Sequence, residues 1–308
     1  MSGLEDAHSR RSFACWISDY YHRYRNTIYV PLVLLAPCII VLVVLFLYPV
    51  VTLMLQAFQH APGDPGKALT LNNFRKLFGD FYYLNILLRS LMVGLSTAIL
   101  TLCLGYPLAL FLARSKYKKK DLLLILLVSP LYTSIVVRVY AWMVILGRGG
   151  LINSFLISRG IIQEPMPLML NMTGVLIGLL HVYYAFMVLS VYSVVVNIDP
   201  ALEEAAMNLG ATRLRTLREI TIPLSTAGIL AGSLLVFVLA MGAYVVPALL
   251  GGRKVMMISN LISTVIIDSF NWPFGAAIAT TLLIIALLLA YFYAKLLKSP
   301  ALEGGSKV

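Results

Sequence analysis

The sequence is poor in charge. Only 12% of its 308 residues are charged, whereas 60% are hydrophobic and the mean hydropathy is +0.89. A soluble domain carries about 25% charged residues and about 45–50% apolar ones. The shortage of charge therefore excludes an ordinary soluble domain and predicts an all-α integral membrane protein that crosses the bilayer several times.

Cysteine and nucleotide-binding motifs are scarce as well. The three cysteines form no CxxC pair and no Cys/His cluster, so we expect neither a disulfide framework nor a metal site. The nearest candidate for a phosphate-binding loop, APGDPGKA at 61–68, has Ala61 in place of the first glycine and Ala68 in place of Ser or Thr. No Ser/His/Asp or paired-carboxylate arrangement is recognisable, and we expect no catalytic residue in this chain.

Long charge-free intervals indicate the membrane spans. About 20 apolar residues cross the roughly 30 Å hydrocarbon core of a bilayer, and six intervals are long enough once Arg138 is accepted within the third. A membrane domain is predicted at 28–297, between an N-terminal tail at 1–27 and a C-terminal tail at 298–308. Its six transmembrane helices are predicted at about 28–58, 86–113, 122–146, 171–197, 222–249 and 271–294.

Lysine and arginine predict the orientation of these helices. With both termini in the cytoplasm, 15 of the 24 basic residues fall on cytoplasmic segments, and the other 9 lie outside or near the outer boundary. The cluster RSKYKKK at 114–120 is the firmest anchor because its loop is short. A net charge of +11 would suggest nucleic acid in a soluble protein. Here membrane topology explains the charge, and we expect no nucleic-acid partner.

A polar insert at 199–222 separates the fourth and fifth spans and is predicted to face the cytoplasm. Its pattern predicts a helix, an elbow and a second helix: Asp199 caps the first helix, Gly210 ends it, and Pro223 opens the next span. Small residues such as Ala205 allow another backbone to approach closely, so the first helix could act as a lever held by a partner. An amphipathic helix resting on lipid headgroups is the alternative, although the insert contains no Trp or Phe.

The insert resembles the EAA loop of ABC importer permeases. The family pattern is E-A-A-x3-G-x9-I-x-L-P, and here Glu204-Ala205-Ala206 is followed at the same spacing by Gly210, Ile220 and Pro223, with Ile222 in place of the leucine. The resemblance implies a coupling helix that docks into a groove of a cytoplasmic ATPase. The residues expected to take part in this coupling are Glu203, Glu204, Ala205, Ala206, Gly210, Arg213 and Pro223.

Four further blocks resemble permeases of spermidine/putrescine importers: RVYAW at 138–142, GRGGLIN at 147–153, PALLGG at 247–252 and NWPFGAA at 271–277. The resemblance implies a subunit of an ATP-driven importer in a bacterial inner membrane, forming half of the pathway for a polyamine or another small cationic or amino-acid-like solute. It also implies a second permease subunit, a dimer of ATPase subunits and an extracytoplasmic solute-binding protein. ATP and Mg²⁺ would bind the ATPase, and this chain would hold no cofactor.

Polar and aromatic residues inside the spans are candidates for the solute pathway. His181 lies about ten residues into the fourth span, where a hydrogen bond to a neighbouring helix is an equally good explanation. Arg138, near the outer end of the third span, is expected to have a structural role. Carboxylates and aromatic faces would suit a polyamine, but the membrane interior offers no Asp or Glu. The candidates are Tyr244, Trp142, His181, Asp268 and Trp272, with packing or interface anchoring as the alternative for each aromatic residue.

A self-sufficient secondary transporter is the alternative of a different class. It should carry ionisable residues or broken helices near the middle of the membrane, often in repeated halves. His181 is the only ionisable candidate at that depth, and no internal repeat is recognisable. A membrane enzyme would need catalytic groups, which the sequence does not show.

Overall fold

The computed structural model describes residues 35–60, 69–115, 119–252 and 255–297. All regular secondary structure within these ranges is helical. Both terminal tails and part of the basic cluster at 114–120 lie outside the described residues. The chain divides into two units, residues 1–56 and 57–308, which are described separately.

In the first unit the described residues form one apolar helical stretch. Leu35–Gln56 is 22 residues long with a mean hydropathy of 2.9, which is enough to cross a membrane. It contains a π-helical turn, η1 (Val43–Leu47), followed by α2 (Tyr48–Gln56). This stretch lies inside the first predicted span.

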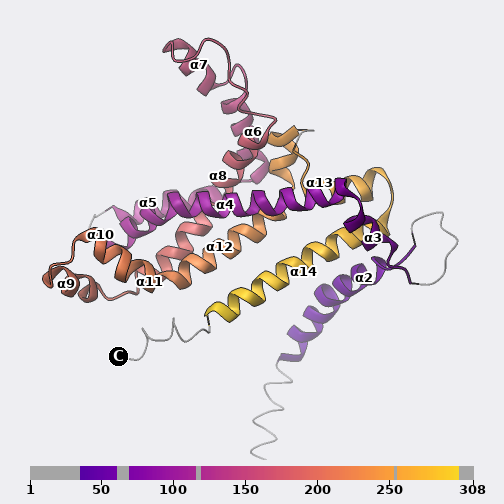
Figure 1. Cartoon of the computed structure of the whole chain (residues 1–308), viewed down its shortest axis with the longest axis horizontal. Coiled ribbons are helices and arrows are strands. Elements are labelled where there is room, and N and C mark those ends of the chain that lie inside the picture. Colours follow the sequence, from indigo (N-terminus) through magenta and orange to yellow (C-terminus); the bar gives the residue numbers. More distant parts are fainter. Residues whose placement is uncertain (1–34, 61–68, 116–118, 253–254, 298–308) are drawn as a thin grey trace, which may run out of the picture. The chain divides into compact units, whose positions relative to one another are not determined.

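Three helices form the core of the second unit (Figure 1). They are α4 (Phe81–Arg114), α8 (Met172–Val195) and α12 (Thr226–Met241), and each packs against the other two. A Cβ atom on Gly94 would lie 3.1 Å from the carbonyl oxygen of Phe237, so glycine allows α4 and α12 to approach closely here. Buried aliphatic side chains from all three helices fill the interface, among them Val93, Leu112, Leu179, Val188, Val236 and Ala240.

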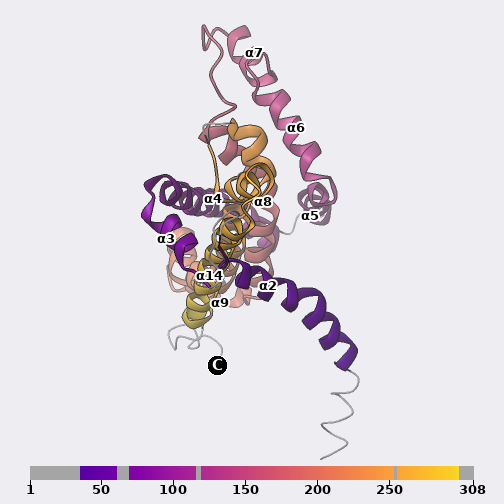
Figure 2. The same ribbon diagram turned by 90° about the vertical axis from the view of Figure 1, so that its right-hand side faces the viewer.

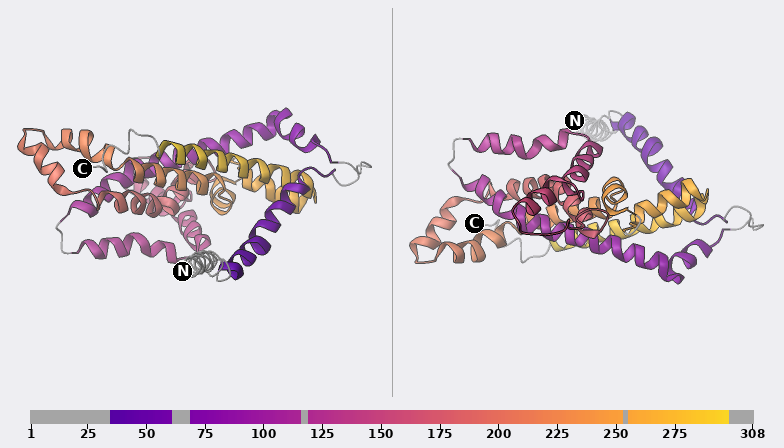
Figure 3. Two further views of the ribbon diagram at one scale, coloured as in Figure 1. Left: turned by 90° about the horizontal axis from the view of Figure 1, so that it is seen from below. Right: turned by 90° about the horizontal axis from the view of Figure 1, so that it is seen from above.

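The last helix, α14 (Trp272–Leu297), packs against α12 (Figure 3). Near its start it also contacts α3 (Asn72–Gly79), α13 (Ile258–Ser263) and η6 (Thr264–Asp268). A second apolar cluster joins these elements around the buried ring of Phe274. The segment before α14 is therefore folded against the bundle.

The third predicted span is interrupted. α5 (Lys120–Val128) runs into a 3₁₀ turn, η2 (Ser129–Tyr132), and α6 (Ile135–Leu146) begins after two extended residues. Figures 1 and 2 show α6 leaving α5 at a steep angle and α7 (Leu151–Ser158) following it. The sequence predicted an unbroken helix here; Pro130 lacks an amide donor and clashes with a preceding turn, which explains the break.

Five helical segments of the described residues are long and apolar enough to cross a membrane, and a bent pair raises the number to six. The pair joins Arg213–Leu224 to α12 at an angle of 65°. Thus α12 is shorter than the predicted fifth span, because the chain bends at its start and unwinds after Met241. The five segments are Leu35–Gln56, Phe81–Arg114, Ile135–Ser158, Met172–Val195 and Trp272–Lys295. The third of them includes α7, which lies in a segment that the sequence assigned to an outer loop.

Candidate functional site

The first half of the 199–222 insert is a short helix that ends at a glycine. α9 (Pro200–Asn208) begins at Asp199, whose Oδ1 accepts a hydrogen bond from the amide of Ala201 at 2.9 Å. Proline suits the first helical position because that amide has no partner within the helix. Gly210 has φ +90°, a left-handed angle that glycine adopts without steric cost. A Cβ atom there would meet nothing within 4 Å, so the backbone angle rather than lack of space favours glycine.

The second half of the insert leads into the membrane helices. Thr212 caps α10 (Arg213–Thr216), which continues through a π-helical turn, η3 (Leu217–Thr221), into α11 (Ile222–Leu224). Pro223 is the second residue of α11, just before the 65° bend into α12. The helix, elbow and helix predicted from the sequence are all present as local structure.

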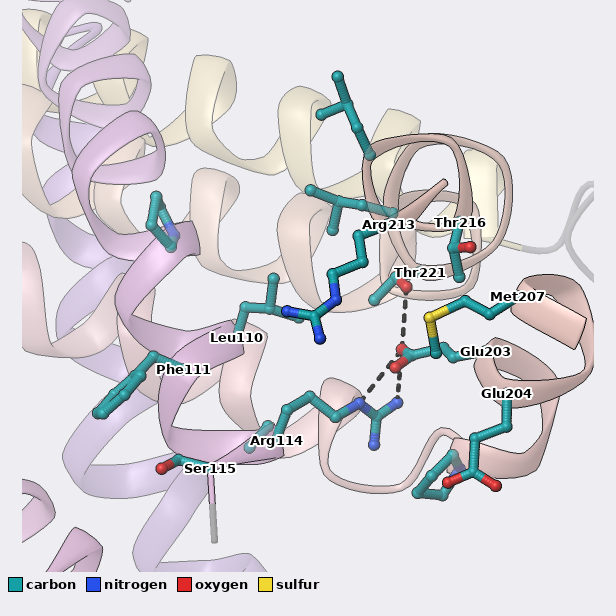
Figure 4. A pocket seen from close by; sticks show the side chains of 15 residues that line it. Leu110, Phe111, Arg114, Ser115, Glu203, Glu204, Met207, Arg213, Thr216 and Thr221 are labelled. Carbon is teal, nitrogen blue, oxygen red and sulfur yellow. Dashed lines mark hydrogen bonds and ion pairs between the residues drawn. The ribbon is translucent and has the colours of Figure 1, made fainter. Parts of the chain in front are cut away.

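Glu203 points from α9 toward the end of α4 (Figure 4). Its Oε1 atom accepts hydrogen bonds from Arg114 Nη2 at 2.9 Å, from Arg114 Nε at 3.2 Å and from Thr221 Oγ1 at 2.9 Å. The other terminal nitrogen of Arg114, Nη1, donates to the carbonyl oxygen of Ile198 at 3.0 Å. The Arg114 and Glu203 side chains are only 20% and 18% exposed. Arg114 thus holds the first half of the insert to the end of α4, and Glu203 joins that half to the second through Thr221.

The neighbouring residues of α9 face outward. The Glu204 side chain is exposed and lies apart from Arg114 (Figure 4), and Ala205 is exposed beside it. Leu209 and Leu214, on either side of the elbow, are 90% and 74% exposed. Large leucine side chains exposed to this degree suit a surface that another protein covers.

An open cleft of about 1060 Å³ lies between the insert and the end of α4 (Figure 4). Arg114 and Glu203 form part of its wall, together with Met207 and the exposed side chain of Arg213. The insert therefore contacts the end of α4 through the Arg114–Glu203 ion pair and leaves space beside it. Such a contact can shift as a unit more readily than a filled apolar interface.

Comparison with known proteins identifies the family. Residues 105–301, more than half of the chain, match the family described as "Binding-protein-dependent transport system inner membrane component", and the match includes the whole insert. The chain belongs to this family. It is accordingly a multi-pass protein of the bacterial inner membrane and a transport permease subunit, and it is not itself an enzyme.

Several members of this family are similar to the chain over most of its length. The spermidine/putrescine transport system permease protein PotB of Escherichia coli (strain K12) is 40% identical over 236 residues, which are 76% of this chain and 86% of that protein. PotB of Haemophilus influenzae is 37% identical over 225 residues, 73% of this chain and 78% of that protein. The E. coli inner membrane ABC transporter permease protein YdcU is 31% identical over 238 residues, 72% of this chain and 75% of that protein.

Solved structures of importers share the fold. A chain of a bacterial ABC transporter that imports the acidic polysaccharide alginate superimposes with a TM-score of 0.67 at 19% identity, covering 90% of this chain and 98% of that one. A chain of the MetNI methionine transporter in an inward-facing conformation gives a TM-score of 0.52 at 13% identity, covering 70% and 94%. At these identities the likeness establishes the fold alone.

In this permease the structure brings two of the five candidate pathway residues together. The rings of Trp142 and His181 lie 5.6 Å apart, centroid to centroid, in a T-shaped contact. Both line a cavity of about 520 Å³, which they share with Arg138 and Tyr184. The Tyr184 hydroxyl donates a hydrogen bond to the carbonyl oxygen of Leu104 at 3.0 Å and so holds α8 to α4.

The other three candidates line neither of these cavities. Tyr244 lies in the unwound segment between α12 and η4 (Pro247–Gly251), where it is 49% exposed and its carbonyl oxygen accepts a hydrogen bond from Asn260 Nδ2 at 3.3 Å. Asp268 ends η6 and is exposed, and Trp272 begins α14 and is 56% exposed. Tyr244 is therefore presented by irregular backbone, as transporters often present their solute-contacting residues.

Sequence reasoning missed two features of these sites. It assigned Arg114 to membrane topology alone, because nothing in the sequence connects it with Glu203, which lies 89 residues away. It also placed Arg138 near the outer end of an unbroken span. The structure instead places Arg138 in the first turn of α6, just after the break, and against α8.

Proposed function

We propose that this permease forms half of the translocation pathway of an ATP-driven importer for polyamines such as spermidine or putrescine. The observation that carries the solute class is the 40% identity to E. coli PotB over 76% of the chain. The four blocks that resemble spermidine/putrescine permeases, within 138–153, 247–252 and 271–277, support the same assignment. The partners are a second permease subunit, two ATPase subunits that bind ATP and Mg²⁺, and an extracytoplasmic binding protein.

In this proposal the chain crosses the membrane six times with both termini in the cytoplasm, and α9 is the coupling helix. The exposed Glu204, Ala205 and Leu209 face the ATPase, while Glu203 faces the chain's own Arg114. Closure of the ATPase dimer displaces α9. The displacement reaches α4 through the ion pair and α12 through the continuous turns of η3 and α11, and this coupled motion opens the pathway alternately to the two sides.

In the described helices of this chain, groups other than carboxylates must select a cationic solute. Helices α8, α12 and α14 contain no acidic residue. The aromatic ring of Tyr244 and the irregular backbone beside it offer cation–π contact and carbonyl oxygens. The second permease subunit and the binding protein supply the remaining selectivity.

Uptake of labelled solutes tests the proposal. We would express the chain with its second permease, ATPase and binding protein in a strain that lacks polyamine uptake, and supply labelled spermidine, putrescine or arginine. We expect a polyamine to enter, and we expect its uptake to require both ATP hydrolysis and the binding protein. Glu204→Lys should abolish this uptake. Entry of arginine without either polyamine would contradict the solute class only, whereas uptake by this chain without the ATPase would contradict the importer itself.

A further inference from the structure

Arg138 and His181 bury polar atoms that lack partners among the described residues. Arg138 Nε, Arg138 Nη1 and His181 Nδ1 are each buried and make no hydrogen bond there. Two buried guanidinium nitrogens without acceptors are expensive inside a membrane protein, and arginines in membrane spans almost always face a partner or a water-filled cavity. The pair therefore points to an acceptor that the described part of this chain does not provide.

The unpaired atoms lie beside the middle of a membrane helix. His181 is the tenth residue of α8, about 14 Å along the axis from its start at 1.5 Å per residue. Tyr184 and Ala185, which line the same cavity as Arg138, are the thirteenth and fourteenth of its 24 residues. An arginine near a helix end can extend its side chain to the headgroup layer. That explanation does not apply to an arginine beside the middle of α8.

The open cavity of about 520 Å³ that these two residues line is otherwise mostly apolar. Its walls come from five elements: Arg138 and Trp142 lie on α6, and the other walls include Leu104 on α4, Leu127 on α5, Pro130 on η2 and Ile177 on α8. The indole ring of Trp142 packs edge-on against the imidazole of His181. A site with apolar walls and a cationic end suits a side chain that has an aliphatic stem and an acidic tip.

We propose that this cavity receives an aspartate or glutamate side chain of the second permease subunit, which pairs with Arg138 and His181. Two carboxylate oxygens offer about four acceptor positions, enough for more than one nitrogen of these two side chains. Lipid phosphates lie at the ends of the spans and not at their middle, and the proposed cationic solute would be repelled by the guanidinium. This inference rests on the proposed function, which supplies both the second permease subunit and the positive charge of the solute.

Assembly of the two permeases provides the first test. The tagged chain is co-expressed with the second permease, extracted in mild detergent, and the amount of the second permease that co-purifies is measured. Because removing one partner of a buried charge pair leaves the other charge unpaired, Arg138→Gln should lower co-purification about tenfold or more. Arg138→Lys should retain part of it. Arg148→Gln, which changes an exposed arginine on the turn after α6, is the matched control and should change nothing.

A carboxylate scan of the second permease identifies the partner. Each Asp or Glu in its spans is replaced by the amide, and we expect one replacement to match the Arg138→Gln defect and to add nothing when combined with it. Exchanging the charges, Arg138→Glu here and that acid to arginine there, should restore assembly. Co-purification of the two permeases is measured without solute. It would therefore be unaffected if the chain did not transport polyamines, and the two proposals can fail independently.

Three results would overturn the proposal. Normal assembly and normal uptake in Arg138→Gln would show that water satisfies the guanidinium. A raised KM for solute at normal assembly, with no coupled acid in the second subunit, would assign the site to the solute. A defect that follows the anionic lipid content of proteoliposomes would assign it to a lipid. If Arg138→Gln does not accumulate in the membrane, the charge exchange decides. Assembly that is restored by one exchanged pair supports the proposal. Assembly that is restored by no exchanged acid of the second permease contradicts it.

Discussion

At the scale of residues, the structure separates two adjacent glutamates that look alike in the sequence. Successive positions on a helix point about 100° apart. Glu203 is thereby directed to Arg114 and Thr221, whereas Glu204 stays exposed. The first therefore holds α9 to α4, and the second is free to contact the ATPase in the proposed complex.

The Arg114–Glu203 pair should be energetically coupled in transport. We expect Arg114→Met and Glu203→Gln each to reduce polyamine uptake while insertion and ATPase binding persist, because α9 then moves without α4. In a double-mutant cycle the coupling should be about 1–2 kcal/mol, or roughly five- to thirtyfold in uptake rate. Uptake assays on membranes with matched amounts of permease measure it.

A second ion pair in the insert serves as the control. Arg215 and Glu219 also form an ion pair at 3.0 Å, but their side chains are 67% and 58% exposed. An exposed pair four residues apart on a helix contributes only about 0.3–0.5 kcal/mol. Arg215→Gln should therefore leave uptake nearly unchanged. Equal effects at both pairs, or strictly additive effects of Arg114→Met and Glu203→Gln, would contradict a coupling role for the buried pair.

At the scale of elements, the elbow at Gly210 orients the two short helices of the insert. Its φ of +90° costs a residue with a Cβ atom about 1–2 kcal/mol. Gly210→Ala should therefore change the angle between α9 and α10 and lower uptake several-fold without affecting membrane insertion. Uptake and membrane abundance, measured on the same samples, test this expectation.

Gly160 offers the matched control for the elbow. It also has a left-handed angle, φ +67°, and a Cβ atom added there would meet nothing within 4 Å, but it follows α7 and lies outside the insert. Gly160→Ala imposes similar local strain and should leave uptake near the level of the unchanged protein. If both substitutions lower uptake equally, the effect of Gly210→Ala is general strain and not a change in coupling.

The same scale shows what the sequence could and could not predict. The helix caps and the elbow of the insert depend on residues within a few positions of one another. The sequence alone could therefore predict that Asp199 caps the first helix and that Gly210 ends it. The break at Pro130 and the 65° bend before α12 lie within predicted spans that are uncharged except for Arg138, and hydropathy does not register a change of direction. The partner of Glu203 depends on the packing of α4, which no local pattern contains.

At the scale of the whole molecule, the described residues of this permease form helices, and five or six of the helical segments are long and apolar enough to span a membrane. Its long apolar runs and its sparse charge are sufficient to predict this class from composition. The proposed work of the molecule depends on what the insert contacts. Among the described residues, Leu209 is the most exposed large apolar side chain of the insert, at 90%.

A photo-crosslinking residue at position 209 in the assembled importer measures that contact directly. We predict a crosslink between this position and the ATPase subunit that is stronger when ATP is bound. Leu69 is the control position, because it is 74% exposed but lies before α3, far along the chain from the insert. The crosslinking residue placed there should give no crosslink to the ATPase. Crosslinking from position 209 to lipid alone, in a complex that contains the ATPase and transports solute, would contradict the coupling role of the insert.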